Sequence, residues 1–223
     1  MLAYVLRRVF QSLVVLLVVG LVAFSMFTFV GDPIDNMLGQ ERTQADIERL
    51  RTQLGLDQPF PVQYWKFLQN AVQGDFGISY RQGRPVSEII VERLPATLEL
   101  AAVSGLFAIV LGIGLGVLTA IRRDGWLSNV IMTVSLIGVS LPTFLIGILL
   151  IYVFSVELDM LPSFGRGETV KIGWWSTGFL TQSGLTALIL PAITLGLYQM
   201  TLIMRLVRSE MLEVLRQDYI RFA

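Results

Sequence analysis

The 223-residue chain is 54% hydrophobic and only 15% charged, with a mean hydropathy of +0.67. Soluble domains carry about 25% charged residues, so this composition predicts a membrane protein. The chain has no cysteine, which excludes disulfides and thiol chemistry, and no histidine, which removes the commonest metal ligand. Without these side chains no catalytic or metal site is predicted. Its 17 basic and 17 acidic residues balance, so the net charge indicates no partner, and no nucleic-acid partner is predicted.

Four apolar stretches are long enough to cross a membrane. After a tail at 1–8, the predicted spans lie at 9–30 and at about 99–121, 130–154 and 186–206. Roughly 20 apolar residues, each rising about 1.5 Å along a helix, cross the ~30 Å hydrocarbon core. A cleaved signal peptide is the alternative for the first stretch. Its apolar residues continue to Gly31 without a small-residue cleavage site, which favours a retained span.

Basic residues gather on one side of these spans. The two end segments and the turn at 122–124 hold eight arginines and four acidic residues, whereas the loops at 31–99 and 155–185 hold nine basic and 13 acidic residues. Positive charge is retained on the cytoplasmic side of a membrane. The sequence therefore predicts a multi-pass protein whose N-terminus and C-terminal segment are both cytoplasmic.

The loop at 31–95 is predicted to form a small helical domain outside the cytoplasm. A capping-box spacing at Thr43–Asp46 predicts a helix at about 47–54, and a second helix is predicted from Pro61 to about Val72. A third is predicted to start at Pro85 and to stop before Pro95. Such short amphipathic helices need another surface to cover their apolar faces. The domain either caps the bundle or docks an extracytoplasmic partner.

The predicted spans contain small and kinking residues. Gly112 and Gly116 form a GxxxG step, which predicts close helix packing. Ser140, Pro142 and Thr143 interrupt the third span. These three residues either line a water-filled pathway or make ordinary helix contacts.

Charge is missing from the middle of every predicted span. Glu99 is predicted in the first turn of the second span, where the helix dipole favours an anion. Ionisable groups at mid-membrane cost at least about 2.5–3.5 kcal/mol and usually serve coupling ions or protons. The energy for any transport is therefore predicted to come from elsewhere. The loop at 155–185 is predicted to be irregular turns with no assigned chemistry.

The C-terminal segment continues the helical pattern beyond the last span. An unbroken pattern from Gly196 to Ala223 predicts a rigid lever. Tyr219, Ile220 and Phe222 are large apolar groups well beyond the membrane. We expect them to fold back onto the bundle or to contact a cytoplasmic protein, because exposed apolar patches are rare on free surfaces.

Short motifs along nearly the whole chain, in order, resemble those of one family. They are GDP at 31–33, QLGLDQP at 53–59, GDFGISY at 74–80, GRPV at 83–86, ERLPATLEL at 92–100, GVSLPTF at 138–144, LPAITLG at 190–196 and SEMLEVLRQDYIRFA at 209–223. The chain resembles the permease subunits of oligopeptide/dipeptide-type ABC importers. The similarity is to the subunit type with a long extracytoplasmic loop after its first span.

The resemblance implies an all-α type I ABC importer fold, with residues 96–223 forming a partial transmembrane domain and four of six expected spans present. It implies a second permease, two cytoplasmic ATPases that bind ATP and Mg²⁺, and an extracytoplasmic substrate-binding protein, all at a bacterial or archaeal plasma membrane. This chain itself would bind no cofactor. Short peptides are the implied substrates, although similar importers handle glutathione, nickel complexes and other small solutes.

The resemblance also implies that 207–223 enters a cytoplasmic coupling segment. The family's coupling helix begins with a Glu-Ala-Ala-like triplet, and a glycine follows three residues later. Arg221, Phe222 and Ala223 occupy the triplet here, and only Ala223 matches it. The sequence ends before the glycine and the last two spans, so a fragment is expected. The implied ATPase-coupling residues are Gln217, Asp218, Tyr219, Arg221, Phe222 and Ala223.

Two other functional classes remain as alternatives. An ion-coupled transporter or channel lacks the expected mid-span charges, although backbone carbonyls can also bind sodium. A membrane anchor or assembly subunit would use the outer loop to capture a partner. An intramembrane enzyme is the weakest alternative, because no carboxylate pair or Ser/Lys pair lies within a span.

Overall fold

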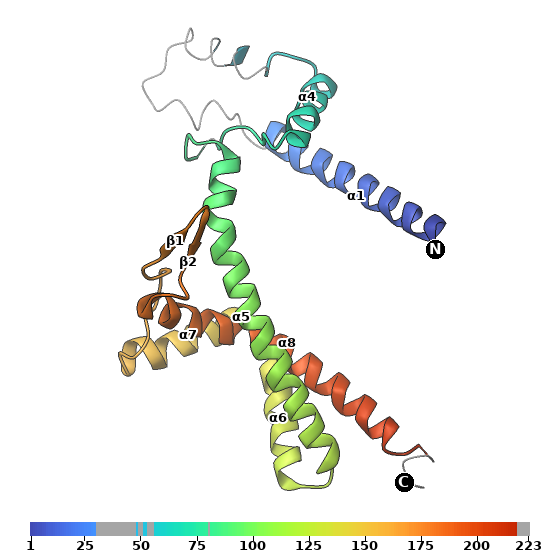
Figure 1. Cartoon of the computed structure of the whole chain (residues 1–223), viewed down its shortest axis with the longest axis vertical. Coiled ribbons are helices and arrows are strands. Elements are labelled where there is room, and N and C mark those ends of the chain that lie inside the picture. The colour runs from blue at the N-terminus through green and yellow to red at the C-terminus, as the bar shows by residue number, and fades with distance from the viewer. Residues whose placement is uncertain (30–47, 49–50, 53–55, 80, 218–223) are drawn as a thin grey trace. The chain divides into compact units, whose positions relative to one another are not determined.

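The computed structural model describes residues 1–29, 48, 51–52, 56–79 and 81–217 (Figure 1). The chain divides into two compact units, Met1–Val91 and Glu92–Ala223. Apart from a short hairpin and a single bridge, the regular structure of the described residues is helical. The predicted all-α class is confirmed.

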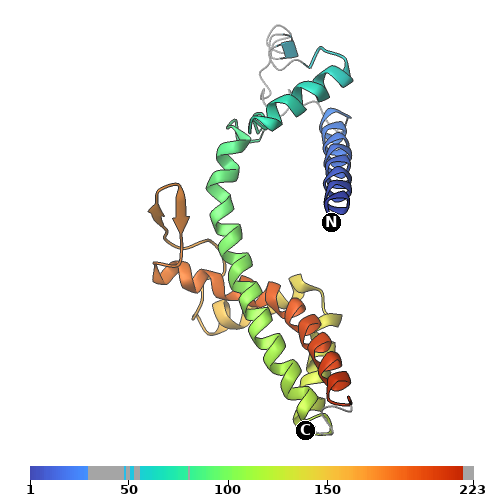
Figure 2. The ribbon, with the colours of Figure 1, turned by 45° about the vertical axis from the view of Figure 1, so that its right-hand side comes forward.

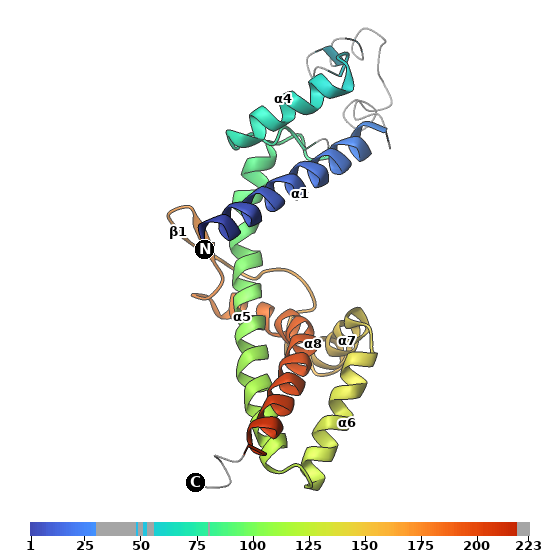
Figure 3. The ribbon, with the colours of Figure 1, turned by 90° about the vertical axis from the view of Figure 1, so that its right-hand side faces the viewer.

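In the described part of the first unit, α1 (Leu2–Phe29) contacts α4 (Phe60–Val72). Figure 3 shows α4 beside α1. The ring of Phe24 on α1 lies 5.5–5.8 Å from three aromatic rings on one face of α4, which are Phe60, Tyr64 and Phe67. The Tyr64 hydroxyl also donates a hydrogen bond to the Leu17 carbonyl, at 2.6 Å. The apolar face of this short helix is therefore covered by α1.

The helix predicted at 47–54 falls mostly outside the described residues. Glu48, Arg51 and Thr52 are helical, and the predicted capping box at Thr43–Asp46 is not among the described residues. Residues 1–8, predicted as a tail, belong mostly to α1, which begins at Leu2.

The helix predicted to start at Pro85 does not stop at Pro95. It is the first part of α5 (Val86–Ile121), a single helix of 36 residues. A proline inside a helix loses one backbone hydrogen bond and costs about 3 kcal/mol in isolation. Pro95 is buried within the second unit, so packing offsets that cost. The prediction that places Glu99 in a first turn is therefore wrong, because Glu99 lies 13 residues after the start of α5.

The third predicted span is broken. It consists of α6 (Trp126–Ser140), α7 (Thr143–Ile151) and a π-helical turn, η1 (Tyr152–Glu157), with a bend of 104° at the break. The break falls at Ser140, Pro142 and Thr143, the residues predicted to interrupt this span. Pro142 explains the break, because it has no N–H to bond back into α6 and it occupies the N-cap position of α7.

The loop predicted as irregular turns contains a hairpin. Strands β1 (Val170–Ile172) and β2 (Trp175–Thr177) pair antiparallel, with Ile172 opposite Trp175. The two-residue connection contains Gly173 at φ +64°. Tight hairpin turns require a positive φ, which glycine adopts without strain. The strands are only three residues long, too short for a periodic pattern in the sequence.

The last helix, α8 (Gln182–Val214), has 33 residues and ends earlier than predicted. The Thr181 side chain caps it by accepting a hydrogen bond from the Gly184 N–H at 3.1 Å. After Val214 the backbone closes into i→i−3 turns, so the predicted unbroken helix to Ala223 is wrong. Beyond the packed part of α8, helix propensity alone gives little stability in water.

Among the described residues, α1, α5 and α8 are long and apolar enough to cross a membrane. The bent α6–α7 pair makes a fourth span if its two halves are counted as one. Figures 2 and 3 show α8 lying along the C-terminal half of α5 in the second unit.

Candidate functional site

The contact between α5 and α8 depends on glycine. A Cβ atom placed on Gly112 would lie 2.9 Å from the Cβ of Ile203, and one on Gly116 would lie 2.8 Å from the Cβ of Val207. Both separations are shorter than ordinary van der Waals contact. The structure thus places the two glycines of the GxxxG step where the α8 backbone approaches α5. Sequence periodicity could not identify α8 as the partner helix.

Small residues extend this contact along one face of α5. Buried residues recur at four-residue intervals, namely Ser104, Ala108, Gly112, Gly116 and Ala120. The glycines at 105 and 114 lie off this face, and added Cβ atoms there would meet no atom within 4 Å. Small side chains at this spacing allow close backbone approach, which is the main source of packing energy between membrane helices.

The C-terminal end of α5 is tied to both neighbouring helices. The Thr119 carbonyl accepts a hydrogen bond from the Ser128 hydroxyl on α6 at 3.2 Å and one from Arg208 Nε on α8 at 3.4 Å. Thr119 is fully buried. A carbonyl near a helix C-terminus favours cationic partners, so Arg208 fits this position electrostatically.

A buried carboxylate ties the other part of α5 to the hairpin loop. Glu99 is 2% exposed, and its Oε2 accepts hydrogen bonds from Arg166 Nη2 and the Gly178 N–H, each at 3.2 Å. Its Oε1 accepts one from Trp175 Nε1 at 3.1 Å. We call Glu99, Arg166, Trp175 and Gly178 the Glu99 clasp.

Arg166 extends the clasp into the hairpin. Its Nη1 donates to the Ser176 hydroxyl at 3.0 Å, and its Nη2 also donates to the Ser176 carbonyl. One guanidinium thus bridges the carboxylate of α5 and the backbone of β2. Sequence reasoning missed this pair, because no local pattern joins residues 67 positions apart. The available signal was an acidic residue directly before the apolar run at 100–121.

The predicted pathway residues Ser140, Pro142 and Thr143 come together at the break between α6 and α7, and all three are exposed. The Ser140 hydroxyl donates to the Leu136 carbonyl at 2.8 Å. Their role in lining a pathway stays a prediction.

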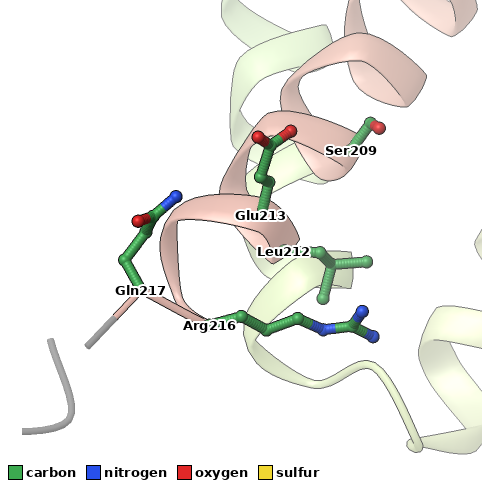
Figure 4. Close-up of a pocket in the computed structure, with 5 residues that line it drawn as sticks. All are labelled: Ser209, Leu212, Glu213, Arg216 and Gln217. Carbon is green, nitrogen blue, oxygen red and sulfur yellow. The ribbon is translucent and has the colours of Figure 1, made fainter.

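The predicted coupling residues are described only at Gln217. It lies at a pocket of about 540 Å³ at the end of α8, whose lining side chains are shown in Figure 4 and are Ser209, Leu212, Glu213, Arg216 and Gln217. The other predicted coupling residues, Asp218, Tyr219, Arg221, Phe222 and Ala223, lie outside the described residues. Across the part of the chain that the structure describes, no group of three or more His, Cys, Asp or Glu could hold a metal ion.

Two family descriptions together cover most of the chain. Residues 1–101 match the N-terminal region of binding-protein-dependent transport system membrane components, and residues 112–223 match the binding-protein-dependent transport system inner membrane component.

Similar proteins carry permease names. The chain is 40% identical to a putative peptide transport system permease protein of Brucella abortus, over all of this chain and 69% of that protein. It is 36% identical to a dipeptide transport system permease protein of Alkalihalophilus pseudofirmus, over 99% and 70% of the two chains. It is 37% identical to a glutathione transport system permease protein of Escherichia coli, over 100% and 68%.

These similarities run along the entire chain and confirm the resemblance carried by the motifs. They do not favour the ion-coupled alternative. The chain therefore belongs to the family of binding-protein-dependent transport system inner membrane components, and it is a membrane permease subunit of an ABC importer.

Proposed function

We propose that this chain forms half of the translocation pathway for short peptides or related small solutes. The relatives named above are described as peptide, dipeptide and glutathione permeases. Glutathione is itself a tripeptide, so the substrates in all three names are small molecules with amide bonds and charged ends. A second, similar permease would supply the other half of the pathway, and an extracytoplasmic binding protein would deliver the substrate.

In this proposal the chain is not catalytic, and two cytoplasmic ATPases bind ATP and Mg²⁺ and drive transport. The observation that carries the proposal is the continuous α8 helix packed closely on α5. Its 33 residues rise about 50 Å, which is enough to connect the two faces of a membrane. Close backbone contact at Gly112 and Gly116 makes the pair stiff, so displacement at the C-terminal end reaches the far end.

We place the N-terminus and the C-terminal end of α8 in the cytoplasm. Arg7 and Arg8 precede the apolar part of α1, and Arg122 and Arg123 lie in the turn between α5 and α6. Arg216 lies two residues after the end of α8. Basic residues at these ends support this orientation through the positive-inside rule. The membrane would be the plasma membrane of a bacterium or archaeon.

The proposal is tested by reconstituting the complete importer in liposomes with its binding protein. We expect uptake of labelled di- and tripeptides to require internal ATP and the binding protein, and to be unaffected by collapsing proton and sodium gradients. Uptake that continues without ATP and follows an ion gradient would contradict the proposal. If the importer takes up no dipeptide, no tripeptide and no glutathione, the proposed substrate class is rejected but the ATP-driven mechanism is not.

The tail residues Tyr219 and Arg221 are proposed to contact the ATPases. We expect Tyr219→Ala combined with Arg221→Ala to lower uptake and stimulated ATP hydrolysis together, because an aromatic and an arginine anchor commonly dominate an interface, each costing about 2 kcal/mol or more when truncated. Tyr4→Ala combined with Arg8→Ala is the matched control, since it removes the same side chains at the other end on the same proposed side. Unchanged uptake and hydrolysis in the tail variant would refute the assignment.

A further inference from the structure

The carboxylate of Glu99 is buried, and both of its oxygens are already hydrogen-bonded within the protein. Both of its oxygens accept bonds, from a guanidinium, an indole and a backbone N–H, and the side chain is 2% exposed. A carboxylate that binds a transported peptide or cation would need at least one open oxygen. Its chemistry is therefore that of a fixed structural anion, paired with Arg166 at 3.2 Å.

The clasp joins segments that are distant in the sequence. Glu99 is separated from Arg166, Trp175 and Gly178 by 67, 76 and 79 residues. These partners lie before the hairpin, on β2 and just before α8. One buried side chain thus fixes the position of the entire loop between α7 and α8 on the side of α5.

The same loop is independently fastened to the start of α8. The Glu168 N–H donates to the Ser183 hydroxyl at 3.0 Å, and the Thr181 hydroxyl donates to the Glu168 carbonyl at 2.6 Å. A Cβ atom on Gly184 would collide with the Gly178 carbonyl, so the two backbones are in direct contact there. Movement of the loop must therefore carry the start of α8 with it.

We propose that Glu99 and Arg166 are positioning residues for transport. The clasp makes α5, the hairpin loop and the start of α8 move as one body when the importer changes between a state open to the cytoplasm and a state open to the outside. This inference rests on the proposed function, because it assigns the clasp to the ATP-driven cycle. When the charge pair is lost, ATP hydrolysis continues but moves the loop and α5 separately, so fewer substrate molecules are carried for each ATP.

The test uses the complete importer with its binding protein in liposomes. Glu99→Gln keeps the shape and one acceptor oxygen but removes the negative charge. We expect it to lower the number of peptides transported per ATP by about tenfold, the change expected from losing one charge-assisted hydrogen bond. Basal ATP hydrolysis and assembly of the complex should stay close to wild type. Glu88→Gln is the control, because it makes the same change in the same helix at an exposed pair with Arg84.

A distance measurement separates a positioning role from a merely structural one. The chain has no cysteine, so spin labels can be placed on Leu98→Cys in α5 and Lys171→Cys in β1, both exposed. We expect one narrow distance distribution in the wild type and a broad one with Glu99→Gln. In Glu99→Gln, a broad distance distribution with normal transport per ATP would overturn the positioning role. A narrow distance distribution with lowered transport per ATP would overturn it as well.

Glu99→Asp keeps the proposal testable if the importer that carries Glu99→Gln does not assemble. It keeps the charge but shortens the side chain by one methylene, so its loss of transport per ATP should lie between those of wild type and Glu99→Gln. Wild-type transport per ATP in Glu99→Asp, combined with failed assembly of Glu99→Gln, would overturn the proposal. Failure of the wild-type importer to couple uptake to ATP would instead reject the proposed function.

Discussion

Gly116→Leu is expected to separate α5 from α8 and to prevent assembly of the importer. Even the single Cβ of alanine at this position would lie 2.8 Å from the Cβ of Val207 and 2.9 Å from the Met204 carbonyl oxygen. The carbonyl belongs to the helix backbone and cannot rotate away. Inserting carbon atoms into a well-packed contact costs about 1–3 kcal/mol, and leucine adds three more carbons than alanine.

The matched series uses alanine at each glycine of α5. Gly112→Ala and Gly116→Ala should lower the thermal midpoint of the detergent-solubilised complex, because they destabilise it by about 1–3 kcal/mol. Gly105→Ala and Gly114→Ala should not, because their added Cβ atoms meet nothing within 4 Å. Alanine is also the better helix former by about 1 kcal/mol. Equal midpoints for all four variants would show that α5 and α8 are not packed through these glycines.

Arg166→Ala is expected to have the second largest effect. It leaves the carboxylate of Glu99 buried without a cation, and removing one partner of a buried ion pair typically costs about 3–5 kcal/mol. The Arg166 side chain is 29% exposed, so water can reach the site and the lower end of that range is expected. Thermal unfolding and the yield of assembled complex measure this loss.

A double variant separates charge from packing at this site. Glu99→Gln combined with Arg166→Ala should recover part of the stability lost in Arg166→Ala, because the unpaired charge is gone. Arg123→Ala is the control for an exposed pair, since Arg123 and Asp124 are both largely exposed and such pairs contribute about 0–1 kcal/mol. A double variant less stable than Arg166→Ala would contradict the burial of an ionised Glu99.

The sequence was sufficient to locate the membrane-spanning helices but not to identify which helices pack against each other. Apolar runs of about 20 residues locate α1, α5 and α8, because burial in lipid requires length and composition rather than particular contacts. The GxxxG step indicated a packing face on α5, but nothing in it identified α8 as the helix that fills this face.

Three features depended on tertiary packing and were missed. Pro95 is accommodated inside α5 because it is buried, which a rule for isolated helices does not anticipate. The hairpin strands are too short for a period of two to stand out. The pairing of Glu99 with Arg166 joins residues that are 67 positions apart in the sequence. Long-range polar contacts of this kind leave no local pattern in one sequence.

The break between α6 and α7 has a consequence for solvation. Pro142 offers no amide hydrogen to the carbonyl oxygens that end α6, and the last four carbonyls of a helix have no partner within that helix. Lipid tails cannot hydrate these oxygens, so irregular backbone at membrane depth persists only against another polypeptide or beside water. If α6 and α7 together cross the bilayer, the helix break at Leu141 and Pro142 must be hydrated by water or covered by a neighbouring subunit.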